Sequence, residues 1–397
     1  MTDAFICDAV RTPIGKYTGS LAHVRADDLA AVPLKALMDR NSVDPAAIDE
    51  VFYGCANQAG EDNRDVARMA ALLAGLPVSV PGVTLNRLCA SGADAVGAAA
   101  RAIKTGEAEL TIAGGVESMT RAPLVMAKAT SAFQRSAQIE DTVVGWRFVN
   151  PVMKSLYGAA SMPETGEMVA DRYKVSREDQ DRFGLWSQEK AAAARAFHAE
   201  EIVPVEARDA KGKPFVFDAD EYPRETSLEM MAKLKPVVRP DGTVTAGNAS
   251  GINDGAAAMF VASKGGAAAQ GLTPRARILG FASAGVEPDI MGVGPIYSTR
   301  KLLDRLKLTM ADFDLIEFNE AFASQVIASM RELGVDPFDS RINPHGGGIA
   351  LGHPLGMTGA RLSLTAAHAL EKTDGCLALI TMCVGVGQGV SIVIERV

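Results

Sequence analysis

Short apolar runs alternate with alanine-rich helical segments through the first 120 residues of the chain. Their pattern predicts buried strands at residues 5–10, 50–54 and 109–115, and an amphipathic helix at residues 27–40. Residues 92–102 are rich in Ala and Val and contain no proline, so a further helix is predicted there. Strands that alternate with helices in this way indicate an α/β fold built from βαβ-type units.

The pattern changes between residues 121 and about 245. This stretch contains both tryptophans and many of the methionines, and its apolar residues alternate poorly. We therefore expect an inserted, partly helical loop domain over residues 121–245. Apolar segments at 256–262 and 275–281 resume the α/β pattern. The predicted domains are an N-terminal half, residues 1–270, which carries the insertion, and a C-terminal half, residues 271–397.

The two halves repeat one another. When Asp39 is aligned with Asp304, both segments read as a helix, a short loop and a strand, and several residues are identical or similar without a gap. Further along, the turn that carries Cys89 aligns with the turn that carries His353, and each turn precedes a predicted helix. A duplicated α/β unit with a pseudo-two-fold axis would allow these two helix starts to face each other.

Composition narrows the class of protein. Of 397 residues, 48% are apolar and 22% charged, which is typical of a globular chain of two or more domains. The formal charge of −8 argues against general binding to nucleic acid or to an anionic membrane. Five cysteines without a C-x-x-C pair favour reduced thiols in a cytoplasmic enzyme over disulfides or a zinc site. We detect neither a signal-peptide pattern nor an apolar stretch long enough for a membrane span.

Cys89 is the first candidate for chemistry. It lies in a tight turn directly before the predicted helix at 92–102. Unpaired N–H groups and the dipole at a helix start favour an anion, so we expect the pKa of this thiol to be lowered and the sulfur to be nucleophilic. The alternative is a buried structural cysteine, which is a common fate of free cysteine.

Three other polar residues follow predicted strands, where ligands of α/β sheets bind. His353 is a candidate base with an expected pKa near neutrality, or a packing residue beside a helix start. Cys383 is either reactive or part of the core. Asn319 is either a site residue or the cap of a helix beginning at Glu320. We interpret Cys7, Cys55 and Cys376 as structural.

Six short motifs occur in one order on this duplicated frame: NRLCASG (86–92), GGVESM (114–119), GNASG (247–251), NEAF (319–322), GHP (352–354) and CVG (383–385). With them, the chain resembles the thiolases over essentially its whole length. The resemblance implies a five-layer α-β-α-β-α sandwich made of two similar halves. It also implies a CoA thioester substrate, no permanently bound cofactor, and a homotetramer or dimer.

The resemblance also assigns roles. Cys89 would carry the acyl group, since a covalent intermediate splits one hard step into two. His353 would be its base, and Cys383 the acid and base at the α carbon of acetyl-CoA. One oxyanion hole would consist of the backbone N–H groups of Cys89 and Gly385. The other would consist of His353 and a water held by Asn319.

Coenzyme A requires cations and an apolar tunnel. By resemblance, Arg224 contacts the nucleotide, Ser250 the pantetheine, and Met162 lies beside the thioester, while Ala246 and Phe322 line the same tunnel. Arg224 belongs to the densest basic stretch of the chain. The alternative is an ordinary solvated surface. The stretch comprises Lys211, Lys213, Arg224, Lys233, Lys235 and Arg239.

Four longer stretches resemble the thiolases that act on 3-oxoadipyl-CoA in aromatic catabolism: residues 53–64, 144–151, 161–165 and 381–389. A dicarboxylic substrate would need a cation, and Arg64, Arg135 and Arg147 are candidates. The alternatives are a thiolase for acetoacetyl-CoA or for fatty 3-oxoacyl-CoA. Less favoured are a cysteine hydrolase and a non-catalytic CoA-binding protein.

The chain departs from the family at one position. It has HGGG at residues 345–348, where thiolases usually have Asn-Gly-Gly-Ala. His345 therefore either lies near the active site or is a tolerated polar replacement in a glycine-rich loop.

Overall fold

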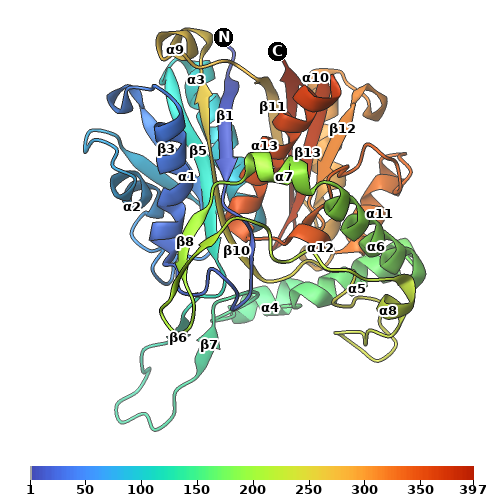
Figure 1. Cartoon of the computed structure of the whole chain (residues 1–397). Coiled ribbons are helices and arrows are strands. Elements are labelled where there is room, and N and C mark those ends of the chain that lie inside the picture. Colours follow the sequence, from blue (N-terminus) through green and yellow to red (C-terminus); the bar gives the residue numbers. More distant parts are fainter. Residues whose placement is uncertain (1) are drawn as a thin grey trace.

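The strands of the N-terminal half form one side of a ten-stranded sheet in the computed structural model, which describes residues 2–397 (Figure 1). Their order is β4–β3–β5–β10–β1, and β2 pairs with β10. β3 runs parallel to β4 and β5, whereas β10 runs antiparallel to β5 and β1. The strands are β1 (Phe5–Arg11), β2 (Gly15–Lys16), β3 (Glu50–Gly54), β4 (Gly82–Leu85), β5 (Leu110–Ser118) and β10 (Asn253–Ala262).

The C-terminal half repeats this order as β12–β13–β14–β11. β12 runs parallel to β13, as β3 does to β5, and a parallel bridge from Ile316 to Ile342 takes the place of β4. The repeat expected from the sequence is therefore confirmed. A short antiparallel pairing of β1 with β11 joins the two halves. The strands are β11 (Ala276–Gly285), β12 (Leu315–Phe318), β13 (Leu377–Val384) and β14 (Gln388–Arg396).

Two equivalent helices, α3 (Ser91–Thr105) and α13 (Leu355–Thr373), pack together between the two halves of the sheet. The two helices approach so closely that their backbones are in contact. A Cβ added to Gly359 would lie 2.3 Å from the backbone nitrogen of Ala93, and one added to Gly92 would lie 2.6 Å from the Gly356 carbonyl oxygen. Glycine is therefore required at these crossings.

Helices also cover both outer faces (Figure 1). α1 (Ala26–Arg40) and α2 (Val66–Leu73) cover the N-terminal strands, and α10 (Gly294–Leu306) and α11 (Ala323–Glu332) cover the C-terminal ones. Together with the central pair they give five layers, as the resemblance implied. Within residues 2–397, we find no helix with the length and apolar character to cross a membrane. Two short helices complete the frame, α9 (Lys264–Ala269) and α12 (Gly348–Leu351).

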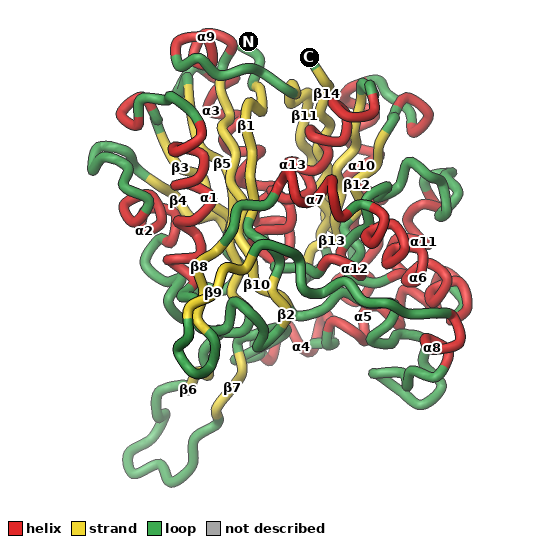
Figure 2. The backbone as a smooth tube through the Cα atoms, viewed as in Figure 1, coloured by secondary structure: helices red, strands yellow, loops and turns green. Residues whose placement is uncertain are grey.

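The insertion combines helices with two small hairpins. β6 and β7 form a hairpin whose connecting loop extends away from the rest of the molecule (Figure 2). The buried Arg11 of β1 fixes the insertion to the sheet, because it pairs with Glu201 at 2.9 Å and Asp220 at 2.8 Å. The elements are β6 (Leu124–Met126), β7 (Ile139–Asp141), α4 (Pro151–Tyr157), α5 (Met162–Tyr173), α6 (Arg177–Ala193), α7 (Arg195–Glu201), β8 (Val205–Arg208), β9 (Pro214–Phe217) and α8 (Leu228–Ala232).

Candidate active site

Cys89 lies in a 3₁₀ turn (Leu88–Ala90) between β4 and α3. Local hydrogen bonds fix this turn: the Leu88 N–H donates to Asn86 Oδ1 at 2.9 Å, and the Ser91 hydroxyl accepts from the Arg87 N–H at 3.0 Å. Leu88 adopts a positive φ of 48°, which turns the chain sharply before the cysteine. As a result, the thiol is presented at the start of the central helix.

Burial governs the protonation of this thiol. It raises the pKa of Cys89 to about 11, although the backbone N–H groups of Gly385 and of Cys89 itself lower that pKa by donating toward the sulfur. The expected lowering of the pKa is therefore wrong, because desolvation outweighs the helix start. The two N–H groups that converge on the sulfur are those that the resemblance assigns to the first oxyanion hole. A buried thiol in this state needs a base before it can attack.

The imidazole of His353, the candidate base, is neutral. The Thr358 hydroxyl donates to the Pro354 carbonyl at 2.8 Å, so it accepts from Nδ1–H of His353 at 2.7 Å. Nε2 therefore carries the lone pair, and the Asn319 amide donates to it at 3.3 Å. Burial, and then the charge of Arg361, lower the pKa of His353 to about 3. The expected pKa near neutrality is wrong for the same reason as at Cys89.

Asn319 contacts His353 and does not cap a helix. Its N–H donates to the Thr381 carbonyl at 3.0 Å, which places it directly after β12. α11 begins only at Ala323, so the alternative of a helix beginning at Glu320 is wrong. Besides contacting His353, the side chain has a buried Oδ1 with no hydrogen-bond partner among the described residues. Because buried polar atoms are normally paired, this oxygen is available to a bound group.

Cys383 is the second-last residue of β13 and lies in an apolar environment. It is fully buried in a cluster with Met291, Phe322 and Ala321, against which Met162 packs. Burial raises the pKa of the Cys383 thiol well above its ordinary value, and a charge on Cys89 raises it further. The two sulfurs therefore interact electrostatically, and Cys383 is a thiol at neutral pH.

Backbone contacts link several of the residues assigned to CoA to one another or to their chain neighbours. The Ser250 N–H donates to the Ala321 carbonyl at 2.9 Å, and Ala249 forms a bridge with Phe322. The exposed Arg224 donates from Nη2 to the Ala246 carbonyl at 2.5 Å. The remaining cations of the basic stretch are more scattered. Lys211 and Lys213 lie in the β8–β9 turn, Lys233 and Lys235 follow α8, and Arg239 pairs with Asp171 at 2.8 Å.

The three arginines proposed for a distal carboxylate lie apart along the chain. Arg64 is exposed in the loop before α2 and has a φ of 57°. Arg135 is exposed in the β6–β7 loop, and the half-buried Arg147 lies between β7 and α4.

His345 packs against the insertion. Its ring stacks on Phe197 of α7 at a centroid distance of 3.7 Å, and its carbonyl accepts from His198 at 2.8 Å. Burial lowers the pKa of the His345 ring to about 4. These contacts favour the alternative of a tolerated replacement in a glycine-rich loop.

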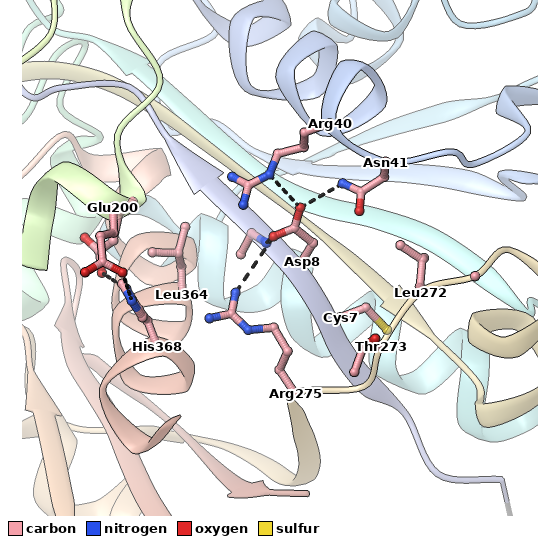
Figure 3. Close-up of a pocket in the computed structure, with 13 residues that line it drawn as sticks. Cys7, Asp8, Arg40, Asn41, Glu200, Leu272, Thr273, Arg275, Leu364 and His368 are labelled. Carbon is pink, nitrogen blue, oxygen red and sulfur yellow. Dashed lines mark hydrogen bonds and ion pairs between the residues drawn. The ribbon is translucent and has the colours of Figure 1, made fainter. Parts of the chain in front are cut away.

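A separate polar cavity of about 400 Å³ lies beside β1 (Figure 3). Arg40 and Arg275 line it, and both face Asp8, at 3.1 and 3.8 Å. Cys7 also lines it, but burial raises the pKa of that thiol to about 12. The cavity therefore combines paired cations with an unreactive thiol and contains none of the catalytic candidates. Cys55 is buried as well, whereas Cys376 is exposed.

Several residues that support the candidate site have little or no signal in the sequence. Thr358 fixes the tautomer of His353, and Asn253 accepts from the His353 N–H at 3.0 Å. The buried Glu117 accepts from the Gly356 N–H at 2.7 Å and from two N–H groups of the loop after β3. Of these residues, only two lie in or next to a motif described above: Glu117 is inside GGVESM, and Thr358 is in the first turn after GHP.

Comparison with known proteins agrees with this fold. The thiolase N-terminal domain matches residues 4–265, and the thiolase C-terminal domain matches residues 272–396. The chain therefore belongs to the thiolase family.

The chain is also similar over its full length to individual relatives and to solved structures. A beta-ketoadipyl-CoA thiolase of Pseudomonas putida is 65% identical, and a 3-oxoadipyl-CoA/3-oxo-5,6-dehydrosuberyl-CoA thiolase of Escherichia coli is 59% identical, each covering 100% of both chains. The acetyl-CoA acetyltransferase of Bacillus anthracis superposes with a TM-score of 0.92 at 38% identity, covering 100% of this chain and 99% of that one. Human mitochondrial 3-ketoacyl-CoA thiolase gives 0.91 at 36% identity, with the same coverage.

Proposed function

We propose that the chain is a thiolase that cleaves 3-oxoadipyl-CoA with CoA to succinyl-CoA and acetyl-CoA, and that also catalyses the reverse condensation. The proposal rests on one observation. The starts of α3 and α13 carry different side chains, and the ends of β12 and β13 lie beside these starts. The turn that carries Cys89 packs against α13, which begins just after His353, and a charge on Cys89 acts on the second thiol, Cys383. The names of the full-length relatives support the substrate.

In the first half-reaction, Cys89 attacks the 3-oxo carbon while its proton passes to Nε2 of His353. The N–H groups of Cys89 and Gly385 stabilise the oxyanion, and each such donor typically lowers a barrier by about 3–4 kcal/mol. The bond between C2 and C3 then breaks, and its electron pair passes to C2 of the departing acetyl-CoA. Cys383 donates its proton to that carbon and becomes a thiolate.

In the second half-reaction, the thiol of CoA attacks the acyl group on Cys89. Its proton passes to the Cys383 thiolate, and His353 returns the first proton to Cys89 as succinyl-CoA leaves. Two buried thiols that are protonated at rest suit this scheme, because each is ionised only while a partner holds its proton. The scheme requires reduced thiols, which supports a cytoplasmic location.

CoA serves as a substrate in this proposal rather than as a resident cofactor. The exposed guanidinium of Arg224 would pair with its phosphates. Ser250 would contact the pantetheine. The apolar side chains of Met162 and Phe322, which pack with Cys383, would surround the thioester, and Ala246 would line the same tunnel.

Substrate preference is tested with a panel of 3-oxoadipyl-CoA, acetoacetyl-CoA and a long 3-oxoacyl-CoA. We expect the highest kcat/KM for 3-oxoadipyl-CoA, measured as CoA-dependent loss of the 3-oxo thioester. Higher values for either other substrate would instead support a general thiolase, such as the acetyl-CoA acetyltransferase of Pseudomonas aeruginosa that is 43% identical. Release of free acid without CoA consumption would support a hydrolase.

We also propose that the β6–β7 hairpin assembles the chain into a homotetramer. It exposes a row of apolar side chains: Leu124 (67%), Met126 (61%), Phe133 (98%) and Ile139 (63%). Exposed apolar patches of this kind mark interaction surfaces. A second copy suits the patch, since the hairpin projects clear of the remaining chain (Figure 1).

Serine at these four hairpin positions should convert the tetramer to dimers in sedimentation velocity. The matched control, Val216→Ser, alters an apolar side chain of β9 that is 60% exposed and should leave the assembly unchanged. An unaltered tetramer in the fourfold variant would exclude the hairpin as the contact.

A further inference from the structure

A buried glutamine contacts the second reactive thiol. Gln325 lies in the first turn of α11, and its Oε1 is 3.5 Å from Sγ of Cys383. Both side chains are fully buried. The other side chains around this sulfur are mostly apolar, among them Met291 and Phe322. The amide of Gln325 therefore supplies a polar contact that the thiol would otherwise lack in this cluster.

The neighbouring backbone determines which end of the amide faces the sulfur. The Ala321 N–H, which can only donate, reaches Oε1 at 3.1 Å. At the other end, Nε2 donates to the Gly292 carbonyl at 3.4 Å. A reversed amide would place a donor against the Ala321 N–H and an acceptor against the Gly292 carbonyl. Oxygen therefore faces Cys383, and the hydrogen bond requires a proton on the sulfur.

We propose that Gln325 is a positioning residue that holds Cys383 as a thiol, in one rotamer, before the carbon–carbon bond breaks. The inference rests on the proposed thiolase mechanism and deepens it. An oxygen acceptor stabilises S–H and does not stabilise a thiolate. Cys383 thus begins thiolysis in the acid form. When C2 of the departing acetyl-CoA accepts the proton, the S–H bond breaks, a C–H bond forms, and the sulfur retains the electron pair.

The test compares Gln325→Met, which keeps the length of the side chain but removes the acceptor, with Gln325→Glu, which retains an oxygen there. For thiolysis of 3-oxoadipyl-CoA, we expect kcat of Gln325→Met to fall about tenfold, as for the loss of one hydrogen bond, with KM within about twofold. Gln325→Glu should recover most of kcat. Alkylation of Cys89 by iodoacetamide should remain at the wild-type rate in both.

Two controls separate positioning from a general loss of structure. Gln180→Met removes a buried glutamine of α6 whose amide donates to the Val175 carbonyl at 3.3 Å, and it should keep kcat. In a Cys383→Ala background, adding Gln325→Met should have no further effect on kcat, since the thiol it positions is absent.

A wild-type kcat in Gln325→Met would overturn the inference while leaving the thiolase mechanism intact. A further loss of kcat in the Cys383→Ala background, or slower alkylation of Cys89, would also overturn it, because Gln325 would then support the site as a whole. A wild-type enzyme without thiolysis would instead contradict the proposed function itself.

Discussion

Replacing Cys89 with alanine should abolish the acyl-enzyme and lower kcat by roughly 10⁴-fold or more, as expected for loss of a covalent nucleophile. Cys89 is the thiol on which two backbone N–H groups converge. Incubation with acetyl-CoA should add one acetyl group to the intact wild-type protein, seen by mass spectrometry, and none to Cys89→Ala.

Cys7→Ala is the matched control for this experiment. Cys7 is also buried, with a pKa raised to about 12, but it lies at the polar cavity beside β1. This variant should be acetylated like the wild type. Acetylation of Cys89→Ala would assign the nucleophile to another residue.

Replacing Cys383 with serine should separate proton transfer from acylation. A hydroxyl nearly matches the shape of a thiol but is a far weaker acid, so Cys89 should still be acetylated. Exchange of the α hydrogens of acetyl-CoA in heavy water should slow by roughly 10²–10⁴-fold, the range for lost acid–base catalysis. Mass spectrometry of the recovered acetyl-CoA measures this rate.

Cys376→Ser is the control, because this cysteine is exposed and precedes β13. It should exchange at the wild-type rate. Wild-type exchange in Cys383→Ser would make Cys383 a core residue. The base would then be sought elsewhere, first at His345, even though that ring stacks on Phe197.

The frame of the protein could be predicted from local patterns. The strands at 50–54 and 109–115 and the helix at 27–40 agree with β3, β5 and α1 to within a few residues, because periodicity reports burial directly. The repeat added the position of His353 relative to Cys89. The two residues do precede equivalent helices, α3 and α13, because equivalent segments of a duplicated sheet end at equivalent places.

The electrostatics of the site could not be predicted in this way. The pKa of Cys89 and that of His353 are set by desolvation, which depends on how completely both halves close over the site. Helix-start arguments capture only the local contribution. The contact of Gln325 with Cys383 joins α11 to β13, and the two residues are 58 positions apart along the chain. No pattern along either segment indicates that contact.

The pairing of α3 with α13 has an evolutionary consequence. Their starts occupy equivalent places in the two halves, yet Cys89, the proposed nucleophile, precedes one helix and His353, the proposed base, precedes the other. A symmetric protein made of two identical halves would present either two thiols or two imidazoles at this junction, and never one thiol with one imidazole. For a chain made by duplication, the proposed mechanism therefore requires that the two copies differ at this junction, and the activity depends on their asymmetry.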